Sequence, residues 1–192
     1  MKKTRKTFLL ATLAAAAFTL SACTGKTATA SQETDTTDSL SSEELIEQEI
    51  RSTAAEGELA PDFTLQDFND KPLTLSSLRG KVLVLDFWGS WCGWCIKGFP
   101  EMKAYYEKYA GKFEILGVDA GDTTDDWKKA VKEHSLPWLH VQVPEDSDLL
   151  KTAYPIEGFP TKMVLDADGK ILKIVVGEDP AFYTYLDELF GK

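Results

Sequence analysis

Two cysteines separated by two residues, Cys92 and Cys95, lie in the segment FWGSWCGWCIKGFP. A pair at this spacing can bind a metal, close a small disulfide loop or exchange electrons with another disulfide. A structural zinc site needs four ligands, and the chain has only two histidines, His134 and His140, which do not stand at the spacing of a zinc finger. No metal site is therefore predicted, although a copper chaperone that uses both cysteines and one histidine stays open as an alternative.

The position of the pair favours redox chemistry. A disulfide across two residues closes a very short loop, which stabilises a fold little. The pair follows an apolar run at 81–88, and apolar side chains then recur at helical spacing from Ile96 to Tyr109, which predicts a buried strand followed by a helix. Cys92 stands at the helix N-terminus, where free N–H groups and the helix dipole lower a thiol pKa. Cys95 lies one turn later, so Cys92 is predicted to attack a substrate disulfide and Cys95 to resolve the mixed disulfide.

The remaining pattern places this strand and helix in an α/β fold. Apolar runs bounded by turn residues predict strands, and apolar residues at three- and four-residue steps predict helices. The order of these elements favours a mixed central sheet flanked by helices. The predicted elements are a hairpin from 63–65 and 73–75, strands at 81–88, 113–120 and 139–143, a helix from the cysteine pair to Gly111, helices at 125–134 and 147–154, a hairpin at 161–176 and a helix at 179–191.

The N-terminal part has the features of an exported lipoprotein. Residues 1–22 combine a basic head with a short apolar stretch, which is typical of a signal peptide. The stretch ends in Leu-Ser-Ala-Cys, which resembles the lipobox of bacterial lipoproteins, so Cys23 is predicted to carry the lipid anchor; an ordinary signal peptide with a chance cysteine is the alternative. Residues 23–57 are predicted to form a disordered tether with a short helix at about 42–55, and residues 58–192 the folded domain.

Charge and compartment limit the function further. The formal net charge is −10, and loss of residues 1–22 removes four basic residues and no acid, which makes it −14. Such a chain repels phosphate backbones, so no nucleic-acid partner is predicted. Outside the cytoplasm disulfides persist. The sequence therefore predicts a membrane-anchored protein of the bacterial cell envelope, on its extracytoplasmic side, and leaves open which membrane holds it.

The segment VLVLDFWGSWCGWC resembles the active-site segment of thioredoxin. APDFTLQDFNDKPLTLSSLRGKVLVLDFW and YPIEGFPTKMVLDADGKI resemble more specifically the extracytoplasmic TlpA/ResA-type branch, and the resemblance extends over about residues 59–192. It implies a thioredoxin-like fold with an N-terminal β-hairpin and a helical insertion at about 120–150. It also implies a thiol-disulfide oxidoreductase that reduces disulfides of envelope proteins, receives electrons from a membrane protein and needs no cofactor besides its Cys92–Cys95 disulfide.

The same resemblance assigns roles to individual residues. Asp86 matches a buried carboxylate that helps to move the proton of the second cysteine, and a charge inside an apolar strand is costly without such a role or a partner. An Asp86 that points to an open edge is the alternative. The lysine that often accompanies this carboxylate is absent, since Ile115 stands in its place. Pro160 matches a proline with a cis peptide bond opposite the cysteines. The residues expected to contact substrate are Trp91, Gly93, Trp94, Phe159 and Pro160.

A peroxiredoxin-like peroxidase is a rival interpretation, because APDFTL also opens proteins of that related group. Those enzymes place a proline and a threonine before the reactive cysteine in the pattern Pro-x-x-x-Thr-x-x-Cys. In this chain the two positions hold Leu85 and Gly89. The sequence therefore disfavours activation of a peroxide.

Overall fold

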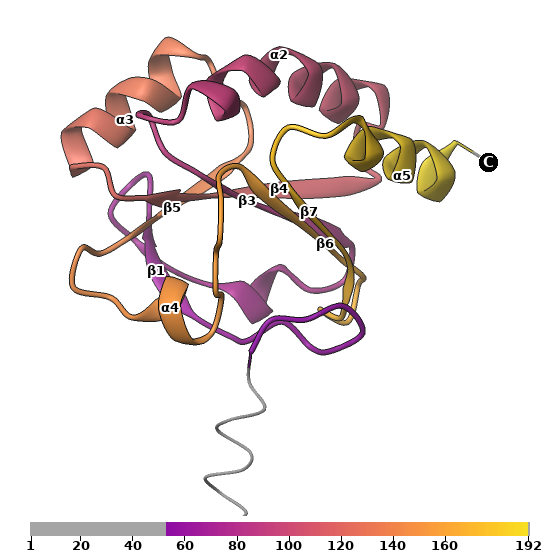
Figure 1. The fold of residues 1–192 in the computed structure, drawn as a ribbon, viewed down its shortest axis with the longest axis horizontal. Helices are drawn as coiled ribbons and strands as arrows, with labels where there is room; N and C mark the ends of the chain where they lie inside the picture. Colours follow the sequence, from indigo (N-terminus) through magenta and orange to yellow (C-terminus); the bar gives the residue numbers. More distant parts are fainter. Residues whose placement is uncertain (1–52, 192) are drawn as a thin grey trace, which may run out of the picture. The chain divides into compact units, whose positions relative to one another are not determined.

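The described residues form a seven-stranded mixed sheet in the order β2-β1-β5-β4-β3-β6-β7 (Figure 1). The computed structural model describes residues 53–191. β3 runs parallel to β4 and β4 parallel to β5, whereas the other neighbouring strands are antiparallel. The strands are β1 (Thr64–Asp67), β2 (Pro72–Thr74), β3 (Val82–Trp88), β4 (Phe113–Ala120), β5 (Leu139–Val143), β6 (Thr161–Leu165) and β7 (Ile171–Val176).

Strand β3 lies inside the sheet, between β4 and β6, and both of its faces are covered. Because successive side chains of a strand point to opposite faces, Leu85 and Phe87 pack into one apolar cluster and Val84 and Trp88 into another. Asp86 stands between Val84 and Trp88 and therefore faces the second cluster. Helices α2 (Gly93–Lys108), α3 (Thr124–Glu133) and α5 (Pro180–Phe190) supply side chains to that cluster, so we call this side of the sheet the helix face.

The opposite face is covered by shorter segments. The 3-10 helix η1 (Leu75–Leu78) and helix α4 (Leu149–Thr152) pack there, together with the chain before β1. Figure 1 shows α4 on one side of the sheet and α2, α3 and α5 on the other. The sheet is therefore the middle layer, and the cysteines belong to the helix face.

Local signals explain where the longer helices begin. Thr123 precedes α3, and its side chain accepts a hydrogen bond from the N–H of Asp126. Asp179 precedes α5 and accepts in the same way from the N–H of Ala181, while Pro180 occupies the first helical position, where its missing N–H costs nothing. These caps set the first residues of α3 and α5. The observed starts differ from the predicted ones by one residue each.

The predicted element order and the mixed central sheet flanked by helices are confirmed, with two differences in detail. Helix α2 ends at Lys108 rather than at Gly111, because Tyr109 caps it. Helix α4 covers only half of the predicted 147–154. The segment expected as a helical insertion at about 120–150 contains α3 and the predicted strand at 139–143, which is β5 and joins the sheet between β4 and β1.

The packed region begins a few residues before the predicted boundary at 58. Ala54 is buried, its N–H donates to the carbonyl of Ala153 at 2.8 Å, and the N–H of Gly57 donates to Ile171 at 2.8 Å. These bonds join residues about 100 positions apart, which no local pattern reveals. Residues 53–55 are not helical. The rest of the helix expected at about 42–55, the predicted signal peptide at 1–22 and the predicted lipidation site at Cys23 lie outside the described residues.

No helix within residues 53–191 combines the length and the apolar composition needed to cross a membrane.

Candidate active site

Cys92 and Cys95 form a disulfide at the start of α2, with an S–S distance of 2.06 Å. Cys92 is the N-cap residue, and its Sγ accepts from the N–H of Cys95 at 3.1 Å. The free N–H groups at this end of the helix stabilise negative charge on the Cys92 sulfur. Cys92 is 6% exposed and Cys95 is 2% exposed. The predicted location of Cys92 at a helix start is confirmed, and it is the slightly more accessible of the two.

Aromatic side chains surround the disulfide on the outer surface. Trp91 and Trp94 are 56% and 62% exposed, and Gly93 between the cysteines is exposed as well. The Trp94 ring carries the Lys97 ammonium over its face at 4.8 Å. Phe159 lies edge-on to Trp91 at 5.0 Å between ring centroids. Side chains that are both apolar and exposed beside a reactive sulfur form a surface that a disulfide-containing polypeptide can contact.

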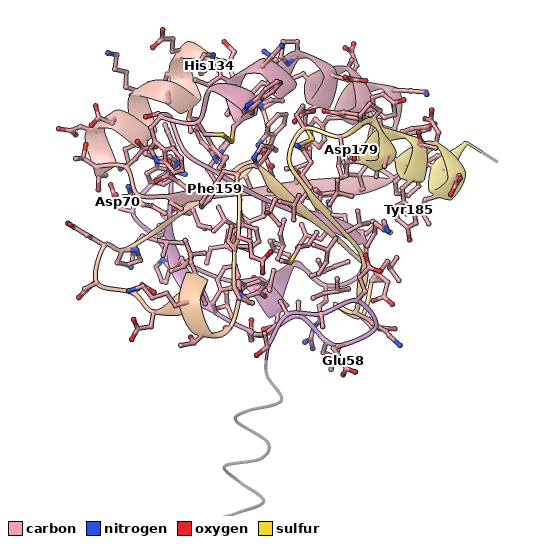
Figure 2. All side chains as sticks on the ribbon, viewed as in Figure 1. Glu58, Asp70, His134, Phe159, Asp179 and Tyr185 are labelled. Carbon is pink, nitrogen blue, oxygen red and sulfur yellow. A yellow bond between two sulfur atoms is a disulfide. The ribbon has the colours of Figure 1, made fainter. Side chains whose placement is uncertain are left out.

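Phe159 and Pro160 belong to the segment that leads into β6. The Phe159–Pro160 peptide bond is cis, as the family resemblance implies, and Pro160 is buried. Phe159 packs against the apolar cluster that includes both cysteines. In the view of Figure 2, the yellow disulfide lies between the labelled positions of His134 and Phe159. The fold thus brings Trp91 and Phe159 together from two distant segments, whereas Pro160, also expected to contact substrate, is buried.

Hydrogen bonds hold the loop before Cys92 in place. The backbone N–H and the hydroxyl of Ser90 both donate to the Asp122 carboxylate, each at 2.6 Å. The indole N–H of Trp91 donates to the carbonyl of Ala120 at 2.9 Å. A Cβ at Gly89 would lie 2.4 Å from the Trp91 Nε1, so only glycine leaves room for this ring. The threonine that a peroxiredoxin has at this position is therefore sterically excluded here.

Asp86 lies on the helix face of the sheet, which also carries the cysteines, and it is only 2% exposed. Burial raises its pKa from 3.8 to about 6, the positive charge of Lys162 opposes that rise, and the negative charge of Glu178 adds to it. No hydrogen-bond partner for its Oδ1 lies among the described residues. The alternative in which Asp86 points to an open edge is therefore wrong, and the carboxyl can change its protonation state near neutral pH.

Sequence reasoning missed two charged residues beside Asp86. Lys162 is the direct cross-strand neighbour of Asp86 on β6, and its side chain is 3% exposed. Its ammonium pairs with Glu178 at 2.7 Å. Lys162 stands inside the apolar run TKMVL, the same signal that singled out Asp86, so it could have been recognised. Glu178 lies in the turn before α5 and carried no such signal. Ile115, which takes the place of the family's usual lysine, is fully buried.

Two neighbouring carboxyl groups, those of Asp119 and Asp122, lie at the end of β4. Asp119 is fully buried. Its burial, and to a smaller extent its interaction with Asp122, raises its pKa to about 9, so its carboxyl is neutral at pH 7. Its Oδ2 faces the amide of Gln142, which donates at 3.3 Å and also donates to the carbonyl of Asp122 at 2.9 Å. This network fixes Asp122, which in turn holds Ser90.

The histidines do not complete a metal site with the cysteines. His140 is buried between Trp88 and Trp138, and His134 ends α3 with its ring 5.5 Å from that of Phe99. Within residues 53–191, no three His, Cys, Asp or Glu side chains are grouped in a way that could hold a metal ion. The copper-chaperone alternative therefore gains no support from the described part of the chain.

Known proteins are similar to this chain in sequence and in fold. The AhpC/TSA family model matches residues 57–174. The thiol-disulfide oxidoreductase ResA of Bacillus cereus (strain ZK / E33L) is 36% identical over 123 residues, which cover 64% of this chain and 70% of that protein. ResA of Bacillus subtilis (strain 168) is 34% identical over 128 residues, which cover 66% of this chain and 70% of that protein.

Solved structures agree with these relatives. The thioredoxin domain of a thiol-disulfide oxidoreductase from Bacteroides vulgatus has a TM-score of 0.65 and 30% identity, and the match covers 72% of this chain and 99% of that one. A thiol:disulfide interchange protein from Bacteroides sp. has a TM-score of 0.63 and 31% identity, with 73% and 93% coverage. The chain therefore belongs to the AhpC/TSA family of thioredoxin-like proteins, within the group related to the ResA-type thiol-disulfide oxidoreductases.

Proposed function

We propose that this protein reduces disulfides of envelope proteins by dithiol–disulfide exchange. The observation that carries the proposal is the Cys92–Cys95 disulfide at the N-terminus of α2, with exposed aromatic side chains around it. Relatives at 36% and 34% identity are named thiol-disulfide oxidoreductases. Fold alone does not define activity, so the intact cysteine pair and its surroundings are the decisive support.

The exchange takes place in two steps. In the reduced protein the Cys92 thiolate attacks one sulfur of the substrate disulfide, which forms a mixed disulfide and releases the other substrate sulfur as a thiolate. Cys95 then transfers its proton to the Asp86 carboxylate, and the resulting thiolate attacks Cys92 Sγ. The Cys92–Cys95 disulfide forms and the second substrate sulfur leaves. Two electrons pass from the protein to the substrate, and a membrane protein that donates electrons must reduce the pair again.

The surface around the pair supports a polypeptide as the substrate. Trp91 and Trp94 offer exposed apolar contact area, and Phe159 packs edge-on against Trp91 beside them. The Trp91 ring is held in place before a partner binds, because its indole N–H donates to the carbonyl of Ala120, whereas Trp94 has an exposed contact with Lys97. A preorganised aromatic surface lowers the entropic cost of binding a flexible partner.

Reduction of the insulin disulfide tests the activity. The protein, reduced beforehand, is expected to precipitate the insulin B chain, and each molecule should become oxidised at Cys92 and Cys95. Hydrogen peroxide should be consumed at the background rate, because Leu85 and Gly89 replace the residues that activate a peroxide. Rapid peroxide turnover without insulin reduction would overturn the proposal in favour of a peroxidase. Tight Cu(I) binding without disulfide exchange would instead favour a chaperone.

We further propose that Cys23 anchors the mature protein in a bacterial membrane on the extracytoplasmic side. The basic head, the apolar stretch and Leu-Ser-Ala-Cys in residues 1–23 support this proposal. A Cys23→Ala variant is expected to lose incorporation of labelled fatty acid and to move from the membrane fraction into the soluble envelope fraction. Continued fatty-acid labelling of that variant would refute the anchor. A Cys95→Ala variant is a suitable control and should stay labelled.

A further inference from the structure

The helix face carries charged residues besides Asp86 that have no role in the two-step exchange described above. Asp86 on β3 and Lys162 on β6 are paired residues of neighbouring antiparallel strands, so their side chains lie on the same side of the sheet. Val84 and Val164, which lie two residues from Asp86 and Lys162, both pack into the apolar cluster that contains Cys92 and Cys95. Asp86 and Lys162 therefore lie on the same face of the sheet as the redox pair.

Glu178 connects this pair of strands to helix α2. Its Oε2 pairs with the Lys162 ammonium at 2.7 Å, and its Oε1 accepts from the hydroxyl of Tyr183 at 2.7 Å. The carboxylate occupies the space beside Gly98, which lies one turn after Cys95. A Cβ at that position would be 2.2 Å from Glu178 Oε2, so the glycine makes room for the carboxylate. Glu178 thus reaches the helix that carries both cysteines.

We propose that the ion pair of the buried Lys162 with the partly buried Glu178 is a positioning element of the redox site. It balances the charge beside Asp86 and thereby sets the pH at which Asp86 can accept the proton of Cys95. The proposal rests on the function proposed above. Lys162 favours the ionised carboxylate by attraction, and Glu178 opposes it by repulsion. Removal of the Lys162 charge should therefore raise the pKa of Asp86, and removal of the Glu178 charge should lower it.

Apart from Lys162 and Glu178, the groups around Asp86 are neutral near pH 7 or, like Glu101, are not among the charges that act on its carboxyl. Tyr183 on α5 is neutral because burial, helped by its bond to Glu178, raises its pKa far above the usual value. Strand β4 places Gly117 next to Asp86, and beyond it on β5 lies His140, whose burial lowers its pKa to about 4. From α2 the facing groups are Cys95 itself and, further along, Glu101, whose charge acts on Tyr183. Lys162 and Glu178 are therefore the charges that tune Asp86.

The test separates attack from resolution with 5,5′-dithiobis(2-nitrobenzoate). Each reduced Cys92–Cys95 pair releases one coloured thiolate when Cys92 attacks and a second when Cys95 resolves the mixed disulfide. The rate of the second release is measured against pH in the full chain carrying Cys23→Ala, so that only the pair reacts. In the otherwise unsubstituted protein this rate should rise with pH with a midpoint near 6, since the ionised Asp86 is the base.

Substitution of each charge should move that midpoint in opposite directions. Glu178→Gln leaves Lys162 unopposed and should lower the midpoint by about 1 pH unit, whereas Lys162→Met leaves two acids together and should raise it by about 1 unit. The double variant should return towards the original value. Lys108→Met removes a lysine that is paired with Asp187 at 2.7 Å on the outer side of α2 and should leave the midpoint unchanged.

The outcomes distinguish the two proposals. If no second thiolate is released, or if Asp86→Asn leaves the profile unchanged, the proposed exchange mechanism fails. If both releases occur and Asp86→Asn abolishes the pH dependence, but Glu178→Gln does not lower the midpoint, the ion pair has only a structural role and the inference is overturned. Glu178→Gln decides this alone if Lys162→Met does not fold, because the amide has the same shape as the carboxyl group.

Discussion

Cys95→Ser is expected to abolish turnover of insulin disulfides, by about 10³-fold or more, and to accumulate mixed disulfides with protein substrates. Cys92 keeps its place at the N-terminus of α2 and still attacks. The serine hydroxyl cannot displace the captured sulfur, so the covalent intermediate persists. Expression of the variant in cells, followed by non-reducing electrophoresis and mass spectrometry of the captured chains, measures the effect and identifies the substrates.

The double variant Cys92→Ser/Cys95→Ser is the matched control for this experiment. It keeps Cys23 and the packing around α2 but has no nucleophile, so it should capture no substrate. Cys92→Ser alone should lose turnover to the same extent and should also capture nothing. Capture of substrates by Cys92→Ser at the level of Cys95→Ser would show that Cys95 attacks first, and it would reverse the assigned roles.

Asp86→Asn is expected to stabilise the folded protein at neutral pH by about 3 kcal/mol. The folded-state pKa of Asp86 is about 6, against 3.8 for an exposed aspartate, and a difference of about 2 pH units corresponds to about 3 kcal/mol. Because the folded-state pKa is raised, the unfolded state releases the proton first. The wild-type protein therefore keeps its full stability only below about pH 3.8 and loses this contribution as the pH rises through 6. An amide cannot ionise and escapes that cost.

Urea unfolding of the oxidised protein from pH 4 to pH 8 measures this difference. The gap between variant and wild type should be small at pH 4, grow up to about pH 6 and stay constant above it. Asp119, with a pKa of about 9, makes both proteins less stable as the pH rises, so its contribution cancels in the comparison. A gap that does not change with pH would show that Asp86 is not a buried, ionised carboxylate at neutral pH. Asp86→Asn should also resolve mixed disulfides slowly. That result would show that the Asp86 carboxyl lowers the stability of the fold but is needed for the reaction.

Local patterns in the chain were sufficient to predict most of the fold. The continuous apolar run of β3 and the helical spacing after Cys95 each depend on residues near one another in sequence. Family resemblance added the cis peptide bond before Pro160, which X–Pro statistics alone do not favour. The position of β5 between β4 and β1 depends on pairing between distant segments and could not be read locally.

The sequence by itself determined the chemistry: two cysteines at the spacing that lets one attack and the other resolve, placed between a buried strand and a helix. It also marked Asp86, because a carboxylate inside an apolar strand must have a purpose or a partner. Only the tertiary structure decided which charges act on that carboxylate. Lys162 and Glu178 are remote from Asp86 in the chain and reach it through strand pairing and through the space left by Gly98. Electrostatic energies depend on distance and burial in three dimensions, and neither quantity is encoded in a local pattern.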